Sequence, residues 1–183
     1  MTVVKGRFDM NEIKLIKPST EYVEQIWEYR AEFISNDDNL AGCAGLESAE
    51  SIEKWLANIE KNSYEETVTE GLVPATTFLA VRKADYRIVG MIDIRHRLNE
   101  FLLQSGGHIG YSVRVSERQK GYATEMVRLA LGYCYETLEL EKVLVTCDKE
   151  NVGSVKTIIA NGGLLENELL ENDRMTRRYW IDL

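Results

Sequence analysis

The sequence lacks the marks of a membrane or exported protein. Its longest charge-free stretches, at residues 71–81 and 101–113, fall short of the roughly 18 apolar residues that a membrane-spanning helix needs. Its first residues contain neither the apolar segment nor the small-residue cleavage site of a secretory signal. We therefore expect a cytoplasmic protein with no membrane partner.

Cysteine and histidine are both scarce. Cys43, Cys134 and Cys147 are odd in number, far apart and without Cys-x-x-Cys spacing, which predicts reduced thiols rather than a disulfide framework. His96 and His108 are the two histidines, and no ligand spacing clusters around them. The sequence therefore predicts no bound metal.

Positive charge is also in deficit. The 183 residues include 30 acidic and 22 basic side chains, which gives a net charge of −8. This balance disfavours a general nucleic-acid binder, because such a protein needs a basic face to neutralise phosphates. It mildly favours cationic small partners, although an acidic surface also serves solubility alone.

What is present is the composition of a folded globular chain, with 44% apolar and 28% charged residues. The pattern predicts one domain over residues 11–183, with residues 1–10 as an N-terminal extension. The loop at residues 36–46 either lines a substrate entrance or only connects two helices. The predicted elements are a strand at 14–17, helices with apolar stripes at 23–34 and 52–59, strands at 76–82, 86–95 and 108–115, a helix at 121–138, a strand at 142–147, a helix at 151–161 and a strand at 174–182.

The predicted helix at 121–138 joins two strands, 108–115 and 142–147. A crossover of this kind is right-handed and leaves the two strands parallel, whereas the three strands before the helix form an antiparallel meander. The sequence therefore predicts an α/β protein of the α+β kind with a mixed sheet.

The loop before this helix is the most informative segment. Unpaired amides at the N-terminus of a helix point outward together, and the helix dipole adds partial positive charge, so that a pyrophosphate can bind there. Gly121 allows close approach of the backbone, small Ala123 packs the turn, and Arg118 and Lys120 add charge. The alternative is an ordinary strand-to-helix turn with two surface cations. Neither a Walker A sequence nor a Gly-x-Gly-x-x-Gly fingerprint is present, which argues against nucleotide hydrolases and Rossmann dehydrogenases.

The run Arg118-Gln119-Lys120-Gly121-Tyr122-Ala123 resembles the Arg/Gln-x-x-Gly-x-Gly/Ala signature of the GNAT family of N-acetyltransferases. The order of the predicted elements over residues 11–183 is also similar to that of the family. The resemblance implies the GNAT fold, with about six to seven strands and about four helices, and acetyl-CoA bound where two central strands splay apart. The cofactor-binding residues that it implies are Val113, Val115, Arg118, Gln119, Lys120, Gly121, Tyr122, Ala123, Thr124 and Asn151.

A second signature lies downstream. The run from Asn151 to Ser154 resembles the Asn-x-x-Ser of the ribosomal-protein acetyltransferase branch, and Asn161-Gly162-Gly163 resembles the Asn/Cys-Gly-Phe that ends its helix, with Gly163 in place of Phe. Many members carry a tyrosine general acid where this chain has Ile158, which excludes a tyrosine acid at that position. The resemblance therefore implies that Ser154 protonates the leaving thiolate. The alternative is that Asn151 is a helix N-cap and Ser154 a first-turn residue.

His108 is the candidate general base. It lies near the place where relatives often have a glutamate, and the ordinary imidazole pKa near 6.5 suits a proton acceptor at neutral pH. The alternative is a structural histidine at the start of a strand. Asp93, Glu100 and His96 are further candidates, and water could carry the proton in place of a side chain.

The resemblance implies an acetyl-CoA-dependent N-acetyltransferase in which a primary amine of a small molecule or peptide attacks the thioester directly. Acetyl-CoA is then a co-substrate, and no metal is needed. The segment at residues 95–108 resembles a subgroup of predicted acetyltransferases and is expected to shape the acceptor pocket. Two alternatives are transfer of a longer acyl group and a CoA-binding sensor or scaffold without turnover. A homodimer is an expectation from the family alone.

Overall fold

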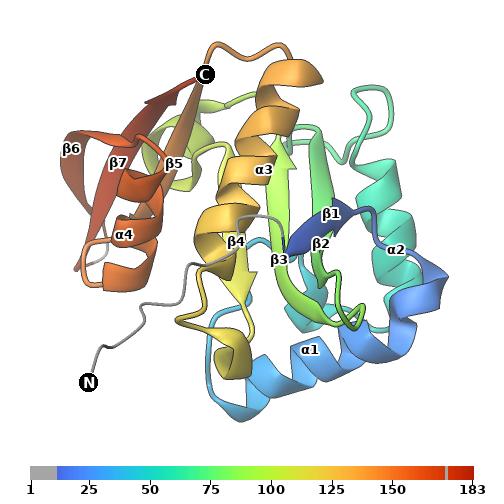
Figure 1. The fold of residues 1–183 in the computed structure, drawn as a ribbon. Helices are drawn as coiled ribbons and strands as arrows, with labels where there is room; N and C mark the ends of the chain where they lie inside the picture. The colour runs from blue at the N-terminus through green and yellow to red at the C-terminus, as the bar shows by residue number, and fades with distance from the viewer. Residues whose placement is uncertain (1–11, 172) are drawn as a thin grey trace, which may run out of the picture.

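The computed structural model describes residues 12–171 and 173–183, so the predicted extension at 1–10 lies outside the described residues. In these described residues, seven strands and four helices follow one another (Figure 1). They are β1 (Ile13–Ile16), α1 (Val23–Ser35), α2 (Ile52–Lys61), β2 (Ala75–Arg82), β3 (Ile88–Arg95), β4 (Ile109–Val113), α3 (Tyr122–Glu136), β5 (Lys142–Asp148), α4 (Val152–Ala160), β6 (Leu164–Glu171) and β7 (Arg174–Asp182).

The strands form two antiparallel sheets, ordered β1-β2-β3-β4 and β5-β7-β6. Between the sheets, β4 and β5 run in the same direction, as the α3 crossover requires (Figure 1). A backbone hydrogen bond of 2.7 Å from His108 N–H to the Leu144 carbonyl joins the sheets where β4 begins. The expected α+β fold is therefore confirmed, and its mixed character lies at the β4–β5 junction rather than in one continuous ladder.

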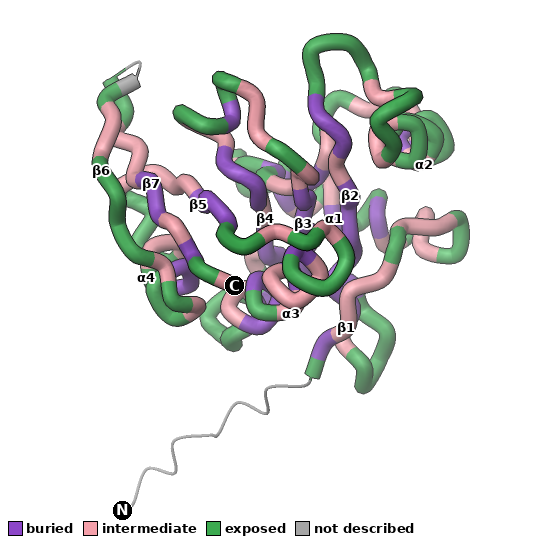
Figure 2. Tube along the Cα trace, turned by 90° about the horizontal axis from the view of Figure 1, so that it is seen from above, coloured by how far each residue is buried: buried purple, intermediate pink, exposed green. Residues whose placement is uncertain are grey.

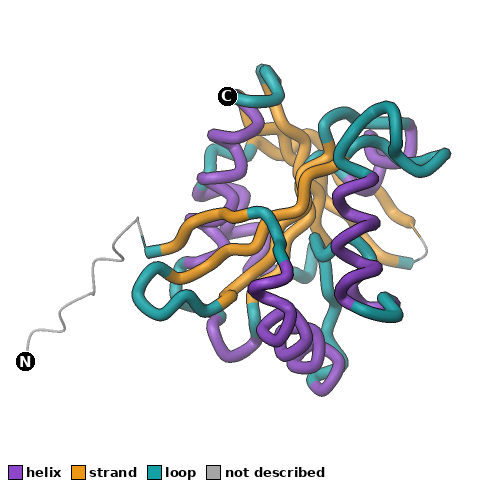
Figure 3. Tube along the Cα trace, turned by 90° about the vertical axis from the view of Figure 1, so that its right-hand side faces the viewer, coloured by secondary structure: helices purple, strands orange, loops and turns teal. Residues whose placement is uncertain are grey.

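Helices cover both faces of the first sheet, as Figure 3 shows from the side. Leu79 and Met91 point toward α1 and α2 in one apolar core, while Ala80 and Ile92, one residue along each strand, point into the core that α3 covers. Figure 2 shows that the central strands are mostly buried and that β6 is exposed at the rim. Among the described residues, no helix is long and apolar enough to cross a membrane.

Two differences from the predicted elements have local causes. The strand expected from Tyr86 begins at Ile88, because Tyr86 adopts a φ of 57° in the β2–β3 turn. β6 has no counterpart among the predicted strands. Its sequence, Leu-Leu-Glu-Asn-Glu-Leu-Leu-Glu, pairs its leucines instead of alternating them, and Leu164, Leu165 and Leu170 are exposed.

Candidate functional site

A loop with left-handed residues connects β4 to α3. After the 3-10 turn Val115–Glu117, Gln119 has a φ of 63° and Gly121 a φ of 81°. In the described part of the chain, the backbone amides of residues 119–124 donate to no protein acceptor. Because α3 begins at Tyr122, these amides stand at the positive end of the helix dipole. The loop is a concave set of donors suited to a polyphosphate anion.

One carboxylate of α1 holds this loop in place. Glu32 Oε1 accepts hydrogen bonds of 2.9 Å from the backbone amide and from the hydroxyl of Ser116, and its Oε2 accepts one of 2.8 Å from Arg114 Nε. Burial alone would raise the pKa of Glu32, but these hydrogen bonds and the Arg114 charge hold it below its ordinary value. Glu32 is therefore ionised at neutral pH and ties the start of the loop to α1.

The two cations expected to bind phosphate are paired with carboxylates. Arg118 Nη2 lies 2.6 Å from Asp38 Oδ2, and Arg118 Nε donates a 3.0 Å hydrogen bond to the Val113 carbonyl. Lys120 Nζ lies 2.8 Å from Glu117 Oε2. A phosphate would therefore have to replace a carboxylate as the partner of each side chain.

The loop opens into a groove of about 960 Å³ between β4 and α4. The segment at residues 36–46 contributes Asp38, Asn39 and Ala41 to the wall, so this segment lines a groove in addition to connecting helices. Of the residues predicted for the site, Val115, Lys120 and His108 do not line the groove. Those that do are Val113, Arg118, Gln119, Gly121, Tyr122, Ala123, Thr124, Asn151 and Ser154.

Two hydroxyl groups meet at the other end of the groove. Ser154 Oγ on α4 lies 2.8 Å from Tyr111 Oη on β4. Burial raises the pKa of Tyr111 to about 12, against a smaller lowering by its hydrogen bonds with Ser154 and Thr157. Asn151 Oδ1 accepts a 3.0 Å hydrogen bond from the Ser154 amide, which makes Asn151 the N-cap of α4. No sequence motif points to the Tyr111 side chain.

The opposite face of β4 is tied to the helical layer. Ser112 Oγ lies 3.0 Å from Tyr29 Oη on α1 and 3.4 Å from Cys43 Sγ. A Cβ placed on Gly42 would lie 2.1 Å from the Gly110 carbonyl oxygen, so the segment at 36–46 packs backbone to backbone on β4. β4 is therefore fixed from both sides, with Tyr111 facing the groove.

The position of His108 argues against the expected role as a base. It is 6% exposed and does not line the groove, and its Nδ1 accepts a 2.9 Å hydrogen bond from the Leu144 amide. Burial lowers the pKa of His108 to about 4, so the imidazole is neutral at physiological pH. Its ring nitrogen and its backbone amide together join β4 to β5, which is a structural role.

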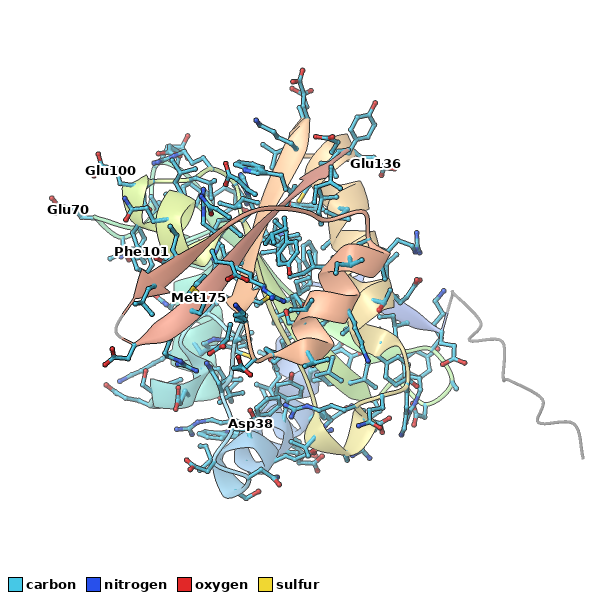
Figure 4. The ribbon with its side chains drawn as sticks, turned by 90° about the vertical axis from the view of Figure 1, so that its left-hand side faces the viewer. Asp38, Glu70, Glu100, Phe101, Glu136 and Met175 are labelled. Carbon is cyan, nitrogen blue, oxygen red and sulfur yellow. The ribbon has the colours of Figure 1, made fainter. Side chains whose placement is uncertain are left out.

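The other candidate bases also lie away from the groove. Asp93 is buried and accepts a 2.8 Å hydrogen bond from Thr77 Oγ1. His96 Nε2 lies 2.8 Å from Thr76 Oγ1, and burial lowers its pKa. Glu100 is far from the groove residue Asp38 in Figure 4. Among the proton routes considered, transfer of the amine proton to water, with no base side chain, fits this arrangement best.

The segment at residues 95–108 folds partly as a π-helical turn, Leu102–Gly106, against the second sheet. The Leu103 carbonyl accepts a 2.8 Å hydrogen bond from Arg178 Nη2 of β7, and Thr146 Oγ1 of β5 donates one of 2.7 Å to the Ser105 carbonyl. Phe101, labelled in Figure 4, is 69% exposed beside this turn.

The three cysteines are free thiols, as the sequence predicts. Burial raises the pKa of both Cys43 and Cys134 to about 12, which makes these two unreactive. Within residues 12–171 and 173–183, no group of three or more His, Cys, Asp or Glu side chains could hold a metal ion.

Comparison with known families decides which fold family this arrangement represents. The family described as "Acetyltransferase (GNAT) domain" matches residues 16–163. The chain belongs to the GNAT acetyltransferase family. The resemblance drawn from the phosphate loop is thereby confirmed, and with it membership of a family of N-acetyltransferases, which use acetyl-CoA.

Individual relatives agree with this assignment. The "Uncharacterized N-acetyltransferase YjdG" of Bacillus subtilis is 24% identical over 164 residues, which cover 90% of this chain and 73% of that protein. The ribosomal-protein-S5-alanine acetyltransferase from Vibrio fischeri is 18% identical with a TM-score of 0.66, and the match covers 93% of this chain and 91% of that one. The microcin C7 self-immunity acetyltransferase MccE, solved with acetyl-CoA and AMP, is 19% identical with a TM-score of 0.62 over 94% of this chain and 93% of its own. At these identities the two structures show a shared fold.

Proposed function

We propose that the protein transfers an acetyl group from acetyl-CoA to a primary amine carried by a small molecule or peptide. The observation that carries the proposal is the set of unpaired amides at residues 119–124, which opens into a groove ending at Ser154. A pyrophosphate at one end and a thioester at the other would fit a groove of this kind. MccE, which shares the fold, was solved with acetyl-CoA bound.

The residues of the loop would hold the cofactor mainly through the backbone. The amides of residues 119–124 would donate to the pyrophosphate, and Arg118, which lines the groove, would turn from Asp38 to add charge, whereas Lys120 lies outside the groove beside Glu117. When Arg118 moves, it would release the Val113 carbonyl, which with Asn151 on the groove wall would then be available to the pantetheine arm.

The end of the groove at Ser154, here called the reaction end, would supply and remove the protons that the reaction needs. Bound acetyl-CoA supplies an activated thioester carbonyl. The groove holds a neutral amine against that carbonyl, and the Ser154 hydroxyl donates its proton to the sulfur as the carbon–sulfur bond breaks. Because His108 is buried and its Nδ1 is engaged, water in the groove carries away the proton that the amine loses.

The amine class of acceptor is supported by fold relatives. One is named for the alanine of ribosomal protein S5, and another is a spermidine N-acetyltransferase chimera of Vibrio cholerae origin. Both names describe acceptors with a free amine, on a protein in the first case and on a small molecule in the second. The net charge of −8 also favours a cationic acceptor.

The test is release of CoA thiol from acetyl-CoA in the presence of a panel of primary amines, including amino acids, polyamines and peptide N-termini. Amine-dependent release supports the proposal. Binding of acetyl-CoA without release across the panel would indicate a sensor or scaffold. Release with longer acyl-CoA thioesters only would assign a different acyl group.

A further inference from the structure

Tyr111 is half-buried, and its hydroxyl has no role in the mechanism proposed above. It projects from β4 into the groove, on the face opposite Ser112, and its Oη lies 2.8 Å from Ser154 Oγ. The two residues are 43 positions apart in the chain and belong to different layers of the fold. Their contact therefore depends on the docking of α4 against β4.

The chemistry of the two hydroxyls sets the direction of this hydrogen bond. A phenol is a stronger acid than an alkanol, so the favoured arrangement has Tyr111 donating and Ser154 Oγ accepting. Burial keeps Tyr111 protonated at neutral pH, because it raises the pKa of the phenol to about 12. With Tyr111 as donor, the Ser154 hydroxyl keeps its own proton, and turning that proton into the groove means turning it away from the neighbouring Cys147 thiol. The Ser154 amide donates to Asn151 Oδ1, which fixes the backbone of Ser154.

We propose that Tyr111 is a positioning residue that acts through Ser154: it aims the Ser154 hydroxyl proton at the leaving sulfur and replaces that proton as it is transferred. The inference rests on the proposed acetyl transfer. It also accounts for Ile158 on α4, since the tyrosine hydroxyl of this chain reaches the site from β4 instead.

The proposed step needs no further reagent, because each proton that is donated is replaced. The carbon–nitrogen bond forms and the carbon–sulfur bond breaks, with its electron pair going to sulfur. The sulfur takes the Ser154 proton, Ser154 Oγ takes the Tyr111 proton, and the proton lost by the amine returns to Tyr111 through water in the groove. The products are an amide and a thiol, and both hydroxyls are restored.

The first test is the Tyr111→Phe variant of the full chain, assayed with the best amine of the panel. The ring keeps its packing while the hydroxyl is lost, so we expect kcat to fall by about 10- to 100-fold and KM for acetyl-CoA to stay within about twofold. The matched control is Tyr29→Phe, which removes a hydroxyl bonded to Ser112 on the other face of β4. The control should lower the unfolding temperature and leave kcat near the wild-type value.

The second test changes the leaving group. Acetyl-seleno-CoA has the shape of acetyl-CoA, but its selenolate leaves without needing a proton at neutral pH. The kcat penalties of Tyr111→Phe and of Ser154→Ala should therefore both shrink to within about twofold with the selenoester. The double variant should be no slower with acetyl-CoA than Ser154→Ala alone, because the two hydroxyls act in series.

The proton transfer from Tyr111 through Ser154 to the sulfur is called the relay here. Its failure can be told apart from failure of the proposed acetyl transfer. Wild-type turnover with amines tests the function, and the ratios between variants test the relay. An active wild type whose Tyr111→Phe variant keeps full kcat overturns the relay alone. Penalties that multiply in the double variant, or that are the same with the selenoester, assign Tyr111 to packing and also overturn it.

Discussion

The two ends of the groove present different kinds of hydrogen-bond donor. At the phosphate end the donors are the backbone amides of residues 119–124, arranged by the left-handed Gln119 and Gly121 at the start of α3. At the reaction end they are two side-chain hydroxyls, Tyr111 and Ser154, from different elements. A backbone site depends on chain conformation, whereas a side-chain site depends on single atoms. Substitutions at the first end should therefore change binding, and substitutions at the second should change the rate.

The largest effect is expected at Ser154. The Ser154→Ala variant removes the hydroxyl proposed to protonate the leaving thiolate, so kcat should fall by about 100-fold or more. The amide of Ser154 still donates to Asn151 Oδ1, so α4 stays capped and KM for acetyl-CoA should change by less than about twofold. Steady-state kinetics measure both constants. Ser48→Ala, at an exposed position away from the groove, is the control. An unchanged kcat would leave Ser154 as an ordinary first-turn residue.

The next effect concerns pH and separates stability from catalysis. The folded-state pKa of His108 is lowered to about 4 by burial, against about 6.5 in the unfolded chain. Between these values the unfolded state binds more protons, so stability is complete above about pH 6.5 and is lost as the pH falls toward 4, by roughly 2 to 3 kcal/mol for this group.

The variant His108→Asn tests this assignment. The Asn side-chain oxygen can accept from the Leu144 amide as Nδ1 does, but it does not titrate. Its unfolding temperature should therefore fall less between pH 7 and pH 5 than that of the wild type, while kcat keeps the same pH dependence. If the fall of kcat at low or high pH disappeared in His108→Asn, His108 would again be the candidate base.

A smaller effect is expected from Gly121→Ala at the phosphate end. The φ of 81° at Gly121 costs an L-residue roughly 1 to 2 kcal/mol, so the loop should relax and present its amides poorly. We expect KM for acetyl-CoA to rise by about 10-fold, with kcat at saturation within about twofold. Gly132→Ala is the matched control in the same helix, since a Cβ there has no atom within 4 Å. A fall in kcat alone would contradict the division between the two ends.

The contrast between the two ends also explains what the sequence could predict. The phosphate loop, its preceding strand and α3 are contiguous, so the chemistry of residues 113–124 could be inferred from local order alone. The apolar periodicity of α1 to α3 likewise predicted these helices near their observed positions, and Gly162-Gly163 marked the end of α4. β6 was missed because Leu164 and Leu165 are neighbours on an exposed rim strand, which leaves no alternation to detect.

The reaction end could not be predicted in the same way. The importance of Tyr111 follows from the β3–β4 register, which places it opposite Ile92, and from the docking of α4. The neutral state of His108 follows from its burial at the β4–β5 junction, where its Nδ1 accepts from the amide of Leu144, 36 residues away. In both cases the residue type is compatible with catalysis, and only the tertiary contact decides whether the side chain faces the groove or joins two strands.

The smallest effect is expected for the ion pair between Asp38 and Arg118, and it tests whether the phosphate end depends on the backbone alone. Asp38, from the segment at 36–46, pairs with Arg118 across the groove at 2.6 Å. If Arg118 must leave this carboxylate to reach the pyrophosphate, Asp38→Asn should tighten acetyl-CoA binding by about two- to fivefold, the range of a partly exposed ion pair. Titration of the dissociation constant at two salt concentrations measures this, with Glu60→Gln, outside the groove, as the control. The gain should shrink at high salt, because screening weakens both the Asp38 and the phosphate contact. Weaker binding in Asp38→Asn would mean instead that the pair holds the groove in its binding shape, and the cofactor end would then depend on a side-chain contact as the reaction end does.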